Sequence, residues 1–325
     1  MMLRRNSLRL LSGAALLALT GLALADNYPS KTIRMIVPAS PGGGADFLAR
    51  VVSPSLGEAL GQSVIVDNRS GASGTIAADL TAKAPGDGYT MLLGQSTSIA
   101  VAPHMYEKLS YDTLRDLKPV TLVAEVPNIL VVNAKVPANT VQELIALAKS
   151  KPNSLNYGSA GKGAPSHLAG ELFEMATGAQ ITHVPYRGAG PAVNALLAGE
   201  IDIMFAPMVA VLPQVKAGRI RALAVTSSHR SAAAPELPTL AESGLKDFEI
   251  SSWFGFFVPA STPAAIVDRL QRDTAKVLKQ PGVIERMGKE GAEPVGSTPA
   301  EFNKYVRAEY AKFGKLVRDK NIKPE

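Results

Sequence analysis

Short apolar runs alternate with longer amphipathic segments along most of the chain. The apolar runs predict strands at Ile33–Val37, Ser63–Asp67, Thr90–Leu93, Asn128–Asn133, Ser154–Tyr157, Ile181–Val184, Ile201–Phe205, Arg221–Val225 and Trp253–Val258. The other segments predict helices at Asp46–Leu60, Thr75–Ala84, Thr140–Lys149, Pro165–Thr177, Ala189–Ala198, Pro213–Ala217, Pro263–Leu278, Pro281–Glu290 and Pro299–Asp319. Strands that alternate with helices indicate an α/β protein with mixed, mostly parallel sheets flanked by helices.

Two extended apolar segments, Val126–Asn133 and Ser252–Pro259, are candidate crossings between two lobes. A chain that leaves one lobe through the first segment and returns through the second forms a double hinge. The expected division is a discontinuous first lobe, residues 26–125 plus 250–325, and a second lobe, residues 126–249. The C-terminal helices would then pack on the first lobe.

The N-terminal 25 residues have the pattern of a secretion signal. Arg4, Arg5 and Arg9 precede the apolar run Leu10–Leu24, and cleavage is expected after Ala25. The apolar run is short for a membrane-spanning helix, which needs about 20 residues, although a retained anchor is the alternative. The expected location is the periplasm.

Composition excludes several function classes. The net charge of +6 falls to +3 without the three signal arginines, and no basic stripe with interleaved aromatic residues indicates nucleic acid. The chain has no cysteine, so it has neither disulfides nor a cysteine nucleophile. Its four histidines lack metal-ligand spacing, and neither a metal nor a cofactor is expected. We expect a monomer.

The first strand leads into three consecutive glycines, Gly42, Gly43 and Gly44, directly before the first helix. A backbone without side chains can approach a ligand closely, and a helix start offers unpaired N–H groups. This combination attracts small anions such as carboxylates. The other interpretation is a tight turn between strand and helix. Asp46 at the start of the helix either caps N–H groups or contacts the ligand.

In open α/β sheets, ligands bind beyond the carboxyl ends of the strands. Five loops occupy such positions: residues 39–45, 94–98, 158–164, 185–188 and 206–207. Small and hydroxyl residues dominate these loops and suit an anion site. The candidate ligand residues are Ser40, Gly42, Gly43, Gly44, Ser96, Ser159, Ala160, Gly161, His167, Arg187 and Ala206.

The candidates have structural alternatives. Ser159 and Gly161 either form a turn or bind the ligand. His167 lies four residues before Glu171 on the next helix, so pairing with that glutamate is its simpler role. Arg187 either binds a carboxylate with two hydrogen bonds or forms a surface ion pair. His104 and His183 have no evident partner.

Enzyme signatures are weak. Residues 158–163 lack the spacing of a phosphate-binding loop, and no Gly-x-Ser-x-Gly elbow occurs. An exported hydrolase that uses Ser159 or Ser96 with His167 is nevertheless an alternative function.

The chain resembles the Bug family of extracytoplasmic solute receptors of tripartite tricarboxylate transporters, which are type II periplasmic binding proteins. Blocks in the family's order and with compatible spacing carry the resemblance: residues 29–38, 41–50, 66–74, 84–90, 157–161, 167–173, 184–188, 212–213 and 216–226. The resemblance implies a two-lobed Venus-flytrap fold without catalysis, partner transporter subunits in the membrane, and a small carboxylate-bearing solute as ligand.

The resemblance also implies where the carboxylate binds: at Ser40–Gly44 and Ser159–Gly161, through backbone donors and ordered waters. Many relatives carry an acidic residue after the strand Ile201–Phe205, where this chain has Ala206 and Pro207. This departure implies a different solute. A receptor that feeds a signalling kinase is a further alternative that the resemblance leaves open.

Overall fold

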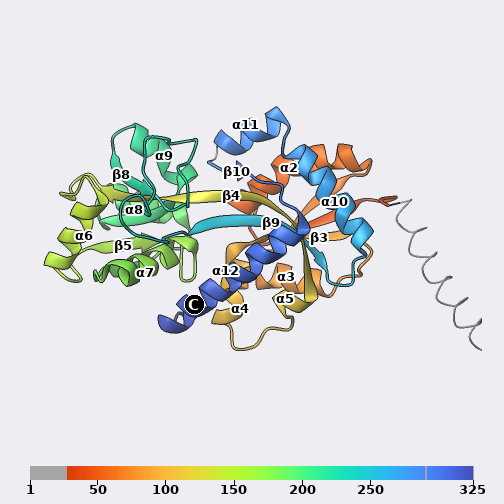
Figure 1. Cartoon of the computed structure of the whole chain (residues 1–325), viewed down its shortest axis with the longest axis horizontal. Coiled ribbons are helices and arrows are strands. Elements are labelled where there is room, and N and C mark those ends of the chain that lie inside the picture. Colours follow the sequence, from red (N-terminus) through yellow and green to blue (C-terminus); the bar gives the residue numbers. More distant parts are fainter. Residues whose placement is uncertain (1–27, 290, 325) are drawn as a thin grey trace, which may run out of the picture.

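The computed structural model describes residues 28–289 and 291–324. The expected signal segment and its cleavage site lie outside this range. Two lobes are joined by the long strands β4 (Leu117–Asn133) and β9 (Ser251–Pro259), as Figure 1 shows. None of the helices in the described part of the chain combines the length and the apolar character needed to cross a bilayer.

The first lobe is built on the parallel strands β1 (Ile33–Val37), β2 (Val64–Asn68) and β3 (Thr90–Gln95), and the expected β1 is confirmed residue for residue. Helices α2 (Gly44–Leu60), α10 (Ala264–Val277) and α11 (Pro281–Lys289) share one apolar core cluster on one face of this sheet. The other face packs against α3 (Thr75–Ala82) and α12 (Pro299–Asp319).

Three short helical segments, η2 (Thr97–Val101), α4 (Ala102–Met105) and α5 (Thr113–Asp116), connect β3 to β4, and the turn η1 (Ala72–Gly74) precedes α3. The sequence pattern does not predict these segments, because each has five residues or fewer. A segment this short does not complete a hydrophobic period.

The second lobe is built on the parallel strands β5 (Asn156–Ser159), β6 (Thr182–Pro185) and β7 (Ile203–Pro207). The antiparallel strand β8 (Ile220–Val225) pairs with β4. Helices α8 (Ala189–Ala198) and α9 (Met208–Lys216) cover one face, and α6 (Val141–Ser150) and α7 (Pro165–Thr177) cover the other. Pro165 opens α7 and Gly178 ends it in the left-handed region, so both boundaries follow the sequence.

Strand β4 belongs to both lobes. Its residues 117–127 pair with β9, and residues 128–133 pair with β7 and β8. All of these pairings are antiparallel, as is that of the short strand β10 (Glu293–Pro294) with β4. The sheet is therefore mixed, with parallel strands inside each lobe and antiparallel strands where the chain crosses. The sequence pattern misses the first half of β4, because Lys118, Pro119 and Glu125 interrupt its apolar run.

Helix α12 runs diagonally beneath the crossing strands and ends near α7 (Figure 1). It begins at Pro299, where the preference of proline for the first helical turn predicts a helix start. Thr298 and Glu301 form a capping box at this start. Trp253 of β9 is fully buried against Phe302 and Tyr305 of this helix, with ring centroids 5.8 Å apart in each case. The C-terminal helix thus packs on the first lobe and reaches the second.

Several predicted boundaries need correction. Strand β5 is shifted by two residues from the predicted Ser154–Tyr157, so Ser159 ends the strand instead of lying in the following loop. Helix α9 begins at Met208, five residues before the expected Pro213, which lies inside the helix. Strand β7 continues through Ala206 and Pro207, which were expected to form a loop, and Ala206 is fully buried. Both residues pair with β4, so the ladder extends the strand beyond its most apolar residues.

Candidate functional site

The glycine loop between β1 and α2 is held by a buried carboxylate. One oxygen of Asp46, in the first turn of α2, accepts a hydrogen bond from the N–H of Gly42 at 2.9 Å. Arg50 Nε lies 3.0 Å from both Asp46 oxygens, and Asn68 donates to Asp46 Oδ1 at 3.0 Å. Asn68 also donates to the carbonyl of Ala39. These contacts fix the loop at both ends.

The charge of Asp46 is stabilised in this position. The hydrogen bond from Arg50 is the main cause, and it overcomes the effect of burial and lowers the pKa of Asp46 to about 2. Of the two expected roles, capping of the helix N–H groups is not what the described contacts show, because Asp46 accepts instead from the N–H of Gly42, in the loop before the helix. A direct contact of Asp46 with the ligand stays a prediction.

Three helices begin at the boundary between the lobes without a side-chain cap. The residues that precede them are Gly43 before α2, Gly188 before α8 and Pro207 before α9, and in none does a side chain accept from the first turn. The first N–H groups of a helix have no partner within the helix and carry partial positive charge. The first lobe contributes one such start and the second lobe two.

A cavity of about 500 Å³ lies between these helix starts. Gly42, Gly43 and Gly44 line it from the first lobe, and Pro207 and Val209 from the second. The remaining lining residues are Phe47, Leu48, Val126, Ala189, Ala210, Ser252, Phe254 and Ala292. Val126, Ser252 and Phe254 belong to the crossing strands, so both lobes and the hinge meet here.

The expected site residues separate into two groups. Gly42, Gly43 and Gly44 line the cavity. Ser40, Ser96, Ser159, Ala160, Gly161, His167, Arg187 and Ala206 are not among its lining residues. Arg187 is exposed, two residues before Ala189, which does line the cavity. The ligand role of all these residues stays a prediction.

The loop Ser159–Gly161 is hydrogen-bonded to residues 186–188, which precede α8. The carbonyl of Ser159 accepts from Tyr186 N–H at 3.0 Å, and that of Ala160 accepts from Gly188 N–H at 3.2 Å. These bonds position the chain directly before Ala189. The N–H groups of Ala160 and Gly161 donate to the hydroxyls of Ser166 and Ser159. In this structure the loop therefore positions a cavity wall rather than forming it.

His167 and His183 lie together beneath this loop. Their rings stack with centroids 4.0 Å apart, and Tyr157 stacks on the other side of His183 at 4.8 Å. His167 Nε2 lies 3.4 Å from Glu171, so the expected pairing is confirmed. His183, for which the sequence suggested no partner, lies 2.7 Å from the hydroxyl of Ser159. His104 likewise has a partner, the carbonyl of Tyr310 at 2.9 Å.

The contact between Ser159 and His183 differs from the pair expected for the hydrolase alternative, which used His167. Ser159 is fully buried, and its hydroxyl also lies 3.2 Å from the carbonyl of Gly161. A nucleophile must reach a substrate carbonyl, and Ser159 lines none of the cavities described here. The contacts of Ser159 hold the loop in position.

The histidine stack makes stability depend on pH. Burial first, then the nearby His167 and Lys162, lower the pKa of His183 from 6.5 to about 4, against the opposing effect of Glu171. The unfolded chain binds this proton near pH 6.5 and the folded chain only near pH 4. The contribution of His183 to stability is therefore complete above pH 6.5 and, allowing for solvent screening, falls by roughly 1–2 kcal/mol as the pH is lowered through this window.

Chemical unfolding at pH 7, 5.5 and 4 measures this effect. We expect His183→Gln, which keeps a polar atom near Ser159, to reduce the loss of stability between pH 6.5 and 4. Identical pH profiles for the variant and the natural protein would contradict the assignment to His183.

The sequence pattern does not identify the apolar part of the site. Phe47 lies in a predicted helix, whose pattern assigns it to the core, whereas Val209 and Ala210 precede the predicted helix start at Pro213. The one indication of the apolar wall in the sequence was the prediction of two crossing segments, which contain Val126, Ser252 and Phe254. A segment that crosses between the lobes necessarily passes the space between them, so some of its residues line that space.

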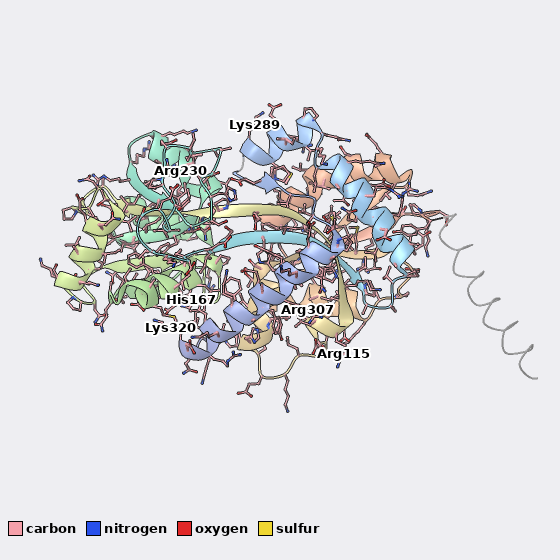
Figure 2. All side chains as sticks on the ribbon, in the orientation of Figure 1. Arg115, His167, Arg230, Lys289, Arg307 and Lys320 are labelled. Atoms are coloured by element: carbon pink, nitrogen blue, oxygen red, sulfur yellow. The ribbon has the colours of Figure 1, made fainter. Side chains whose placement is uncertain are left out.

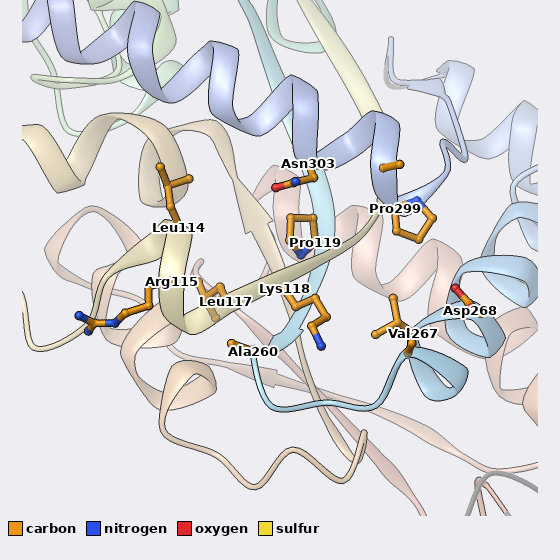
Figure 3. Close-up of a pocket in the computed structure, with 12 residues that line it drawn as sticks. Leu114, Arg115, Leu117, Lys118, Pro119, Ala260, Val267, Asp268, Pro299 and Asn303 are labelled. Carbon is orange, nitrogen blue, oxygen red and sulfur yellow. The ribbon is translucent and has the colours of Figure 1, made fainter. Parts of the chain in front are cut away.

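A second cavity, of about 450 Å³, lies at the start of β4 (Figure 3). Lys118, Pro119 and Asn303 are among its lining residues, together with the starts of α10 and α12. The amine of Lys118 already donates to the carbonyl of Thr262. This cavity is remote from the hinge, and no residue of the second lobe lines it. Among the described residues, no cluster of three or more His, Asp or Glu is placed to hold a metal ion.

Comparisons with known proteins point to one family. Residues 48–322 match the family model described as "Tripartite tricarboxylate transporter family receptor". The chain is 40% identical over 300 residues to protein BugT of Bordetella pertussis, and the match covers 92% of each chain.

Solved structures agree with this match. The structure resembles R. palustris Rpa4515, solved with adipate, at a TM-score of 0.80 and 38% identity over 92% of this chain and all of that one. It also resembles MatC of Rhodopseudomonas palustris, solved with bound malate, at a TM-score of 0.75 and 31% identity over 89% of this chain and all of that one. The expected fold class, a two-lobed α/β binding protein, is confirmed.

Proposed function

Because the chain belongs to the tripartite tricarboxylate transporter receptor family, we propose that it captures a small organic acid in the cavity between its lobes and delivers it to a membrane transporter. Proteins of this family are solute-binding receptors, and they work with transporter components in the membrane. Two relatives were solved with carboxylates, one with adipate and one with malate.

The observation that carries this proposal is the composition of the interlobe cavity. Glycine backbone and the start of α2 face it from the first lobe, and the starts of α8 and α9 face it from the second. A carboxylate that leaves water needs replacement hydrogen bonds, and N–H groups at helix starts supply them. Donors from both lobes bind the acid fully only when the lobes are close together.

Capture then proceeds by hinge closure. The solute enters while the lobes are apart, and its contacts with both lobes favour the closed arrangement. The hinge lies at Val126–Asn128 of β4 and near Ser251 of β9, where the pairing of β4 changes from one lobe to the other. The lobes are residues 26–125 plus 250–325 and residues 126–249. The closed form docks on the membrane subunits.

The mature receptor acts in the periplasm as a monomer. The N-terminal segment directs export and is cleaved after Ala25. The receptor performs no catalysis, in keeping with a family of binding proteins.

A ligand screen tests the proposal. The mature, ligand-stripped protein is heated with adipate, succinate, malate, citrate and benzoate, and with the matching neutral amides. An acid present at 100 times its dissociation constant stabilises the protein by about 2.7 kcal/mol, a large shift of the melting temperature. The amides should give no shift. Equal shifts with the amides, or no shift with any acid, would contradict carboxylate capture.

A further inference from the structure

The side chains that line the interlobe cavity are apolar with one exception, Ser252. Among the thirteen described residues that line it, none has an ionisable side chain, and Ser252 alone carries a hydroxyl. The largest apolar side chains among the lining residues are those of Phe47, Leu48, Val126, Val209 and Phe254. They come from both lobes and from both crossing strands.

Several charged residues lie next to lining residues in the sequence, and most are engaged in other contacts: Glu125 accepts from Tyr305, and Glu293 accepts from Ser231. Asp46 is buried and bonded to Gly42, Asn68 and Arg50, so its carboxylate is already satisfied. Arg187 is exposed, and it is not among the lining residues. Polar recognition in the cavity thus depends on backbone N–H groups, which suit a carboxylate, and on the hydroxyl of Ser252.

Hydroxyl groups on the body of a ligand would find few partners here. A hydroxyl moved from water to an apolar wall loses its hydrogen bonds, and this loss is unfavourable. A purely apolar pocket disfavours an added hydroxyl by a factor of up to about 100. An unsubstituted hydrocarbon body instead gains from burial against the phenylalanine and valine side chains.

We propose that the ligand is an organic acid with an unsubstituted hydrocarbon body, aliphatic or aromatic, rather than a hydroxylated acid. The carboxylate binds at the glycine loop and the helix starts, and the hydrocarbon body contacts Phe47, Val126, Val209 and Phe254. The cavity volume of about 500 Å³ lies within the range of small-molecule sites. This inference rests on the proposed function and narrows its ligand class.

Acids matched in chain length test the inference. Adipate and galactarate share six carbons and two carboxylates, and galactarate adds four hydroxyls. Succinate and malate differ by one hydroxyl. Isothermal titration should give dissociation constants at least tenfold lower for the unsubstituted member of each pair that binds. Equal or tighter binding of galactarate or malate would overturn the inference and leave the proposed receptor function intact. Failure of every acid to bind would instead contradict the proposed function.

A substitution in the wall supplies a second measurement. Val209→Thr keeps the shape of the side chain and adds one hydroxyl to the cavity. We expect the preference for the unsubstituted acid to fall several-fold. Val215→Thr on the same helix is the matched control, because Val215 does not line the cavity. An unchanged preference in Val209→Thr would show that the hydrocarbon body does not contact this wall.

Discussion

Replacing Gly44 by leucine should weaken binding of the acid by at least 100-fold while the protein remains folded. Gly44 lines the cavity as the first residue of α2, and a Cβ built there meets no atom within 4 Å. The new side chain therefore has open space and would project beside the cavity that Gly44 lines. Its bulk would keep the carboxylate from the N–H groups, and a 100-fold loss corresponds to about 2.7 kcal/mol.

Substitutions of Gly42 or Gly43 would test ligand binding less clearly, because they would also disturb the loop itself. Gly42 has φ +85°, which strains any other residue, and a Cβ on Gly43 would lie 3.2 Å from the carbonyl of Ser40. Gly282→Leu is the matched control, because it also begins a helix and its Cβ also meets nothing within 4 Å. Titration with the best acid of the screen measures both variants. Normal affinity in Gly44→Leu would place the ligand elsewhere.

Replacing Lys320 by methionine should lower the unfolding free energy by about 2 kcal/mol. Lys320 follows α12, and its amine lies 2.9 Å from Glu171 and 2.9 Å from Glu174 of α7. Figure 2 shows Lys320 close to His167 at this junction. The three side chains are mostly buried, with exposed fractions of 25%, 15% and 19%. Removing the cation leaves two partly buried carboxylates without their partner, which is unfavourable.

The pH dependence of this loss identifies its source. Burial raises the pKa of Glu171, but hydrogen bonds from His167, Lys320 and Tyr157 outweigh it and lower the pKa to about 2. The contribution of the ion pair is therefore present above the ordinary pKa of about 4.3 and is lost as the pH falls towards 2. The difference between Lys320→Met and the natural protein should shrink over the same interval.

Lys315→Met provides the control for this prediction. Lys315 lies on the same helix and forms an exposed ion pair with Asp319. Exposed pairs contribute little, so we expect a change below about 0.5 kcal/mol. Equal losses in the two variants, measured by chemical unfolding at pH 7, would show that the bridge to α7 has no special role.

Much of the fold could be predicted because local pattern and tertiary structure agree. Helices α7, α8 and α12 begin and end where proline, glycine and apolar spacing place them. The first half of β4 could not be predicted, because its pairing with β9 joins segments more than 100 residues apart. Such pairing stabilises a strand whose own sequence is broken by proline and charged residues.

Prediction of the site residues from the sequence was limited in the same way. The glycines before α2 could be predicted as cavity residues, since their spacing signals a strand-to-helix turn. Val209 and Phe254 could not, because an apolar residue at the edge of a cavity has the same pattern as one in the core. The partner of His183 was hidden for a related reason, since residues 24 positions apart meet only through the parallel pairing of β5 and β6.

The position of β9 has a consequence for the order in which the protein assembles. This strand lies between β3 and β4 in the sheet, yet it follows β8 in the chain. The first lobe therefore lacks a central strand until the whole second lobe has emerged. Pairing between such distant segments is slow to form. The early part of the chain therefore cannot complete its sheet before the late part is available.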